Sequence, residues 1–213
     1  MKPRRHTRLM KKGIVQPLTP VTVILFFIYL LVSTPCAFCQ GGGARERFRS
    51  APTHASTAVL SDDELYLYRL IMNYRQDRGL PSISLSPNLS YVARLHARDL
   101  QLHPPSEPCS MHSWSMYGPW NPVCYTGTRS AKYMWSKPAE LTMYSGKGYE
   151  IVAWKSDRID MDLALSMWID SPEHNNVILN AGIWSRSRWR AIGIAVSDNY
   201  AVVWFGEEPD YDR

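Results

Sequence analysis

Two histidines and one acid, His112, His174 and Glu140, are the residues of this sequence whose types could assemble a binding or reaction site. His112 and His174 each lie in a stretch rich in aromatic or helix-starting residues. Neutral imidazole is a common ligand for zinc and similar divalent metals, and a carboxylate can complete or orient such a site. We therefore predict a cleft whose candidate metal ligands are His112 and His174. Its full set of candidate residues is His112, Glu140, His174, Glu173 and Trp114.

Two functions and one structural role remain open for these residues, and interaction through the exposed aromatic loop alone is a third possible function of the chain. The first function is binding of a small ligand or a divalent metal such as zinc, without catalysis. The second is metal-assisted hydrolysis of a peptide, cell-wall or lipid substrate, which requires His112, Glu140 and His174 to reach one common point. The structural role is hydrogen bonding of both histidines within the fold. Ser113 and Ser171 neighbour the histidines but lie in no G-x-S-x-G pattern, so the sequence favours binding over nucleophilic catalysis.

The charge of the chain is concentrated at its beginning. The formal net charge is +5, and six of the 24 Lys and Arg residues lie within the first twelve positions. The remaining 18 are balanced by 19 Asp and Glu residues. A basic leader on a neutral remainder does not make a nucleic-acid-binding surface, so we expect no nucleic-acid partner.

The basic start is followed by an apolar run over residues 21–32 and then by Ala37-Phe38-Cys39. This order is typical of a signal peptide, and a membrane anchor that is not cleaved is the alternative for residues 1–39. Residues 40–59 are rich in Gly, Ser, Thr and Arg and read as a disordered linker. We expect a secreted or extracytoplasmic protein that meets a membrane only through an uncleaved N-terminal segment.

Two cysteines remain beyond the leader, Cys109 and Cys124. In an oxidising compartment such a pair most simply forms a disulfide. Metal ligation by the pair is disfavoured, because their spacing is not the short C-x-x-C spacing of zinc sites.

Residues 60–213 read as one α+β domain in which helices precede a final hairpin. A long aromatic-rich loop without helices is expected over residues 104–149. Ser61 and Glu64 form a capping box, Ser86-Pro87 starts a second helix, and Ser171 is expected to cap a short helix. The predicted helices cover 61–79, 86–100, 160–170 and 171–179, and the predicted hairpin strands cover 191–196 and 200–205.

The order of these motifs resembles the CAP superfamily, which comprises cysteine-rich secretory, antigen 5 and pathogenesis-related-1 proteins. The resemblance rests on Asn73-Tyr74-Arg75, Gly79-Leu80-Pro81 and Ser86-Pro87-Asn88-Leu89 near the start. It continues in the run from Trp168 to Leu179 and in Ile192-Gly193-Ile194, which look like the bacterial branch.

This resemblance implies a three-layer α-β-α sandwich with a cleft lined by two histidines and two acids. By position, His112, Glu140 and His174 match three members of that set, although Leu141 replaces the asparagine that usually follows the acid. Asp170 and Glu173 are the candidates for the second acid. The family also implies a secreted binding or signalling module, whose partner is a small ligand such as a lipid or another extracellular protein.

Overall fold

The structure is a computed structural model that describes residues 59–210. The predicted leader, nearly all of the predicted linker and residues 211–213 lie outside the described residues. In chain order the elements are α1 (Asp62–Gln76), β1 (Ser84–Leu85), α2 (Pro87–Leu102), α3 (Thr128–Trp135), α4 (Lys137–Leu141), β2 (Gly148–Trp154), α5 (Met161–Asp170), α6 (Pro172–Ile178), the 3-10 helix η1 (Gly182–Trp184), β3 (Ala191–Ser197) and β4 (Tyr200–Gly206).

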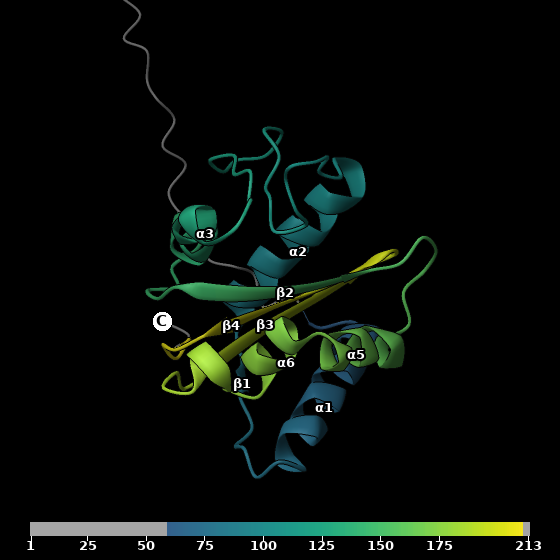
Figure 1. The fold of residues 1–213 in the computed structure, drawn as a ribbon, viewed down its shortest axis with the longest axis vertical. Coiled ribbons are helices and arrows are strands. Elements are labelled where there is room, and N and C mark those ends of the chain that lie inside the picture. Colours follow the sequence, from purple (N-terminus) through teal and green to yellow (C-terminus); the bar gives the residue numbers. More distant parts are fainter. Residues whose placement is uncertain (1–58, 211–213) are drawn as a thin grey trace, which may run out of the picture. The chain divides into compact units, whose positions relative to one another are not determined.

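One four-stranded sheet organises these elements, with strand order β1-β3-β4-β2. β1 pairs with β3 in parallel, and β4 pairs with β3 and β2 in antiparallel register. Helices α1, α5 and α6 lie on one face of the sheet, and α2 and α3 lie on the other (Figure 1). The predicted α+β class and three-layer α-β-α sandwich are confirmed.

Strand alternation gives each face of the sheet its own hydrophobic core, because successive side chains point to opposite faces. Ile151, Val203 and Phe205 pack with α1, α5 and α6. Val152 and Trp204 pack with α2 and with Met134 and Trp114 on the other face. The sheet is therefore covered on both sides.

Local sequence signals place most helix starts and the hairpin correctly. Ser61 and Glu64 form the capping box of α1, and the Ser86 hydroxyl accepts from the Leu89 N–H at the start of α2. The predicted hairpin is present, and Asp198 adopts a φ of +34° in its turn. Helix α1 ends at Gln76, earlier than expected.

The predicted loop over residues 104–149 is wrong in its second half. This stretch contains α3, α4 and the beginning of β2. No side chain caps α3 or α4, so the usual start signal is missing from the sequence. The expected cap of α6 is also absent, since the Ser171 hydroxyl donates to Glu173 at 3.3 Å instead of capping the helix.

The remaining irregular segment after α2 is closed by contacts between its own residues. Cys109 and Cys124 form the predicted disulfide, and Trp114 pairs with Val123 in an isolated antiparallel bridge. This closed loop carries His112. Among residues 59–210, no helix has the length and apolarity needed to cross a membrane.

Candidate functional site

A buried glutamate on the edge strand forms the centre of the site. Glu150 lies in β2, where it points to the same face as Val152 and so toward α2 and the disulfide-closed loop. Its side chain has no exposed surface. A fully buried carboxylate needs hydrogen-bond donors to remain ionised.

Two histidines supply those donors. His112 Nδ1 donates to Glu150 Oε1 at 2.8 Å, and His96 Nδ1 hydrogen-bonds to Glu150 Oε2. His96 Nε2 lies 2.9 Å from the Ser113 carbonyl oxygen. A carbonyl oxygen can only accept, so Nε2 of His96 carries a proton.

These contacts favour a charged pair of His96 imidazolium and Glu150 carboxylate. Burial opposes charge on His96, but the neighbouring carboxylate outweighs it and raises the pKa of His96. Burial likewise opposes charge on Glu150, and the His96 charge together with the two imidazole hydrogen bonds lowers the pKa of Glu150. Trp114 stacks on the His96 ring with centroids 4.3 Å apart, which fixes the plane of that imidazole.

The hydrogen bond to Glu150 sets the tautomer of His112. Because Nδ1 donates to the carboxylate, Nε2 of the neutral ring holds its lone pair. The His112 side chain is 20% exposed, so this nitrogen can meet a ligand. Tyr125 packs edge-on against the ring with centroids 5.2 Å apart.

His174 approaches His112 from the other side of the edge strand. It lies in α6, and the two ring centroids are 6.2 Å apart. Burial lowers the pKa of His174, and a positive charge on His112, when that ring is protonated, lowers it further. His174 is therefore neutral at pH 7 and, like His112, offers a nitrogen lone pair.

The depressed pKa of His174 predicts an acid-dependent loss of stability. Below about pH 6.5 the unfolded chain binds a proton at this position that the folded chain binds only at lower pH. The contribution of His174 to the free energy of unfolding should therefore fall as the pH is lowered from 7 to 5, whereas the raised pKa of His96 acts in the opposite direction. In His174→Gln this fall should be smaller, as measured by urea denaturation at both pH values. Asn176→Gln should keep the wild-type fall, and equal falls in all three proteins would contradict the assignment.

The comparisons with known proteins agree with the fold. The sequence matches the family model described as CAP, the cysteine-rich secretory protein family, over residues 68–205. The chain belongs to the CAP family. A search of curated proteins finds no match.

Solved CAP-type structures resemble the domain at low sequence identity. An extracellular protein containing an SCP domain from Bacillus anthracis superposes with a TM-score of 0.50 at 16% identity, over 68% of this chain and 40% of that one. An outer surface protein from Borrelia burgdorferi gives 0.48 at 19% identity, over 70% and 94% of the two chains. A cysteine-rich secretory protein from Staphylococcus aureus gives 0.46 at 14% identity, over 68% and 38%. This chain thus spans less than half of the Bacillus and Staphylococcus proteins.

Within this CAP domain, Glu150 takes the place that the sequence assigned to Glu140. Glu140 accepts from Lys137 Nζ at 2.7 Å and also hydrogen-bonds to Asn121. Its carboxylate therefore serves a separate cluster, and no hydrogen bond joins it to either histidine in the described part of the chain. We replace Glu140 by Glu150 in the candidate site.

Two other predicted cleft residues have different roles. Trp114 is only 2% exposed and supports His96 from within the core, so it does not line an open cleft. Glu173 is exposed beside His174, and its charge partly offsets the lowering of the His174 pKa. It makes a hydrogen bond to Ser171 and none to an imidazole within residues 59–210.

His96 and Glu150 are the functional residues that the sequence reading missed. His96 lies at an apolar position of α2 among Val92, Ala93 and Ala97, where it read as an ordinary core residue. Glu150 is the one acid within the otherwise apolar β2 sequence Gly148–Trp154. The sequence did offer a signal for this pair. A buried strand holds a single acid and a buried helix face holds a single histidine, and each buried polar group needs a hydrogen-bond partner.

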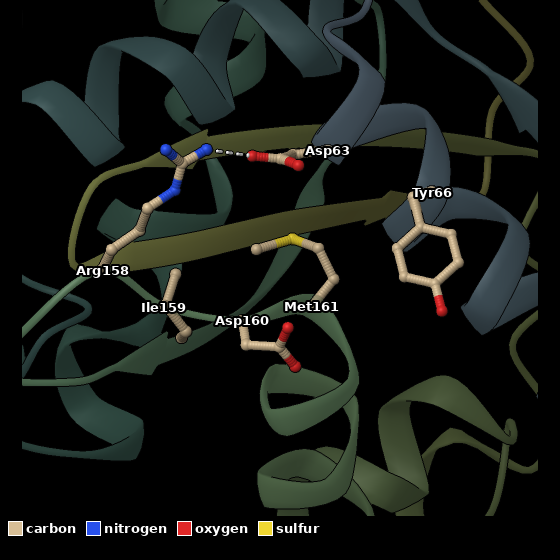
Figure 2. A pocket seen from close by; sticks show the side chains of 6 residues that line it. All are labelled: Asp63, Tyr66, Arg158, Ile159, Asp160 and Met161. Carbon is tan, nitrogen blue, oxygen red and sulfur yellow. Dashed lines mark hydrogen bonds and ion pairs between the residues drawn. The ribbon is translucent and has the colours of Figure 1, made fainter.

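The hollows elsewhere on the surface are separate from this site. One of about 360 Å³ lies between the first turn of α1 and the segment before α5, and Figure 2 shows its lining residues. There Arg158 pairs with Asp63 at 2.7 Å, and Tyr66 and Met161 complete the wall. None of the histidine-site residues line it, so we assign it no role in that site.

Proposed function

We propose that this CAP domain is an exported, non-catalytic binding module that holds a divalent metal, such as zinc, or a small ligand between His112 and His174. The observation that carries the proposal is the hydrogen bond from His112 Nδ1 to the buried Glu150, because it leaves Nε2 of His112 free to bind. A neutral His174 with its ring 6.2 Å away supplies a second nitrogen.

The chemistry of these donors fits a metal such as zinc in part. A metal-bound histidine usually donates its other ring N–H to a carboxylate, and His112 has this arrangement with Glu150. However, residues 59–210 contain no group of three or more His, Cys, Asp or Glu side chains arranged to hold a metal ion. Two imidazoles would thus hold the ion, which would supply open positions for oxygen atoms of a small ligand.

Zinc titration by calorimetry tests this proposal. We expect the wild-type protein to bind about one zinc ion, and we expect His112→Ala and His174→Ala each to weaken binding at least about tenfold. His103→Ala is the matched control, because His103 packs on Tyr117 away from the site and should leave zinc affinity unchanged. Equal zinc affinity in all four proteins would refute the metal site.

Export of the chain is part of the same proposal. The basic and apolar leader pattern supports it. The disulfide between Cys109 and Cys124 suits an oxidising compartment. The similar Bacillus anthracis protein is described as extracellular. Detection of the protein outside the cytoplasm by fractionation, with a new N-terminus near Gln40, would support a cleaved leader.

Hydrolysis is the second candidate function, and one observation favours it. A histidine oriented by a buried carboxylate can act as a general base toward water, and His112 with Glu150 has this arrangement. Zinc-loaded protein can be incubated separately with casein, peptidoglycan and phospholipid vesicles. Product formation by the wild type and its loss in His112→Ala would favour hydrolysis over binding alone.

A further inference from the structure

We propose that the loop between α6 and β3 binds the surface of an anionic lipid bilayer. The loop contains η1 and runs to Arg190. At its tip Ile183 is 86% exposed, so an aliphatic side chain stands almost entirely in water. A single exposed aliphatic side chain is common on folded domains, so Ile183 points to a membrane only together with the charges beside it.

The tip is held on a rigid aromatic base. The Trp184 ring lies 4.8 Å from Tyr149 and 6.5 Å from Trp135, centroid to centroid. Trp189 is buried, and its Nε1 donates to the Val177 carbonyl at 2.7 Å. Ile183 adjoins Trp184 in the chain, so these contacts anchor its backbone and reduce the entropy lost when the tip enters a membrane.

Cations follow this apolar tip in the chain. Arg186, Arg188 and Arg190 are all exposed, and residues 175–197 contain no Asp or Glu. Arg188 and Arg190 flank the buried Trp189 in an extended segment, so both point away from the core. Lys147 adds a fourth positive charge, with its ammonium 5.9 Å from the Trp135 ring.

Three acids at the same end of the sheet offset part of this charge. Glu207, Glu208 and Asp210 follow β4, whose Gly206 carbonyl accepts from the Arg190 N–H at 2.8 Å. Glu207 is also hydrogen-bonded by the Tyr149 hydroxyl at 3.4 Å. The four cations outnumber these acids, and the local charge is positive although the chain beyond its first twelve residues is nearly neutral.

The combination of an apolar tip with arginines favours a bilayer over a soluble polyanion. A polysaccharide or nucleic acid would engage the arginines and leave Ile183 in water. An anionic bilayer takes up both, because its headgroups attract the cations and its acyl region accepts the isoleucine. The leader alone predicted membrane contact only through residues 1–39, and this surface is a second, independent contact.

Flotation of the chain from Gln40 to Arg213 with lipid vesicles tests the proposal. Both cores are built from residues 67–205, so this part carries the complete folded unit, and circular dichroism verifies it. We expect binding to vesicles of equal parts phosphatidylcholine and phosphatidylglycerol, and much weaker binding to phosphatidylcholine alone. Arg188→Ser with Arg190→Ser should lower the partition coefficient about 25-fold, at about fivefold per charge. Ile183→Ser should lower it about tenfold.

Matched variants on other surfaces complete the test. Arg69→Ser with Arg98→Ser removes two exposed arginines from α1 and α2, and Leu102→Ser removes an exposed aliphatic side chain from α2. Both should float like the wild type. Failure of the wild type to bind anionic vesicles would overturn the proposal. A second result would also overturn it. If Ile183→Ser binds normally while loss of the arginines abolishes binding to both vesicles and dextran sulfate, the surface is a general polyanion site.

Discussion

Glu150→Gln is expected to lower the free energy of unfolding by about 3 kcal/mol at pH 7, as measured by urea denaturation. The substitution keeps the shape of the side chain but removes the charge that balances the buried His96 imidazolium. Breaking one partner of a buried ion pair costs about 3–5 kcal/mol, and the retained amide oxygen places this variant at the low end.

A double-mutant cycle separates the pair from general core damage. His96→Gln should also be strongly destabilising, but Glu150→Gln combined with His96→Gln should cost less than the sum of the single variants. Glu173→Gln is the exposed control and should stay within about 0.5 kcal/mol of the wild type. A loss below about 1 kcal/mol for Glu150→Gln, or strict additivity in the cycle, would contradict a charged His96–Glu150 pair.

Gly193→Ala has the second large expected effect, a loss of about 3 kcal/mol in the free energy of unfolding. Gly193 lies in β3 directly beneath α2, and an added Cβ would come within 2.1 Å of the Leu89 carbonyl carbon and 2.3 Å of the Ser90 nitrogen. These atoms belong to backbone, so no side-chain rotation relieves the overlap. The helix that carries His96 would have to move away from the sheet.

Gly79→Ala provides the contrast for that prediction. Gly79 adopts a φ of +72° but has no atom within 4 Å of an added Cβ, so only backbone conformation is penalised. A cost of about 1 kcal/mol is expected for Gly79→Ala. Equal losses at Gly79 and Gly193 in thermal or urea unfolding would show that α2 does not approach β3 as closely as described.

Where the sequence carried local signals, it predicted the fold well. Capping residues such as Ser61 and Ser86 bond to backbone groups three positions away, so their effect is readable without tertiary structure. The last hairpin is likewise local. Strand β2 lacked such a signal because Glu150 interrupts its apolar run, and its stability depends on pairing with β4, which is about 50 residues away in the sequence.

The candidate site was predicted only in part, because some of its residues are brought together by long-range contacts that the sequence does not reveal. His112 and His174 were selected by type and motif, and the structure brings their rings to 6.2 Å. The partner of His112 could not be chosen from sequence, because Glu140 and Glu150 are both acids that follow the same irregular stretch. Their partners in the folded structure distinguish them. Glu150 hydrogen-bonds to histidines, whereas Glu140 pairs with Lys137. The role of His96 depends on α2 crossing the sheet above Glu150, which only the tertiary structure defines.

Zinc soaking of crystals at pH 7, with anomalous diffraction recorded across the zinc absorption edge, tests whether His112 and His174 share a metal site. One anomalous peak is expected between the His112 and His174 rings, about 2 Å from Nε2 of His112, with Nδ1 of that ring still bonded to Glu150. A soaked crystal with no peak between these rings, or with zinc bound only at other histidines, would contradict the proposed binding site.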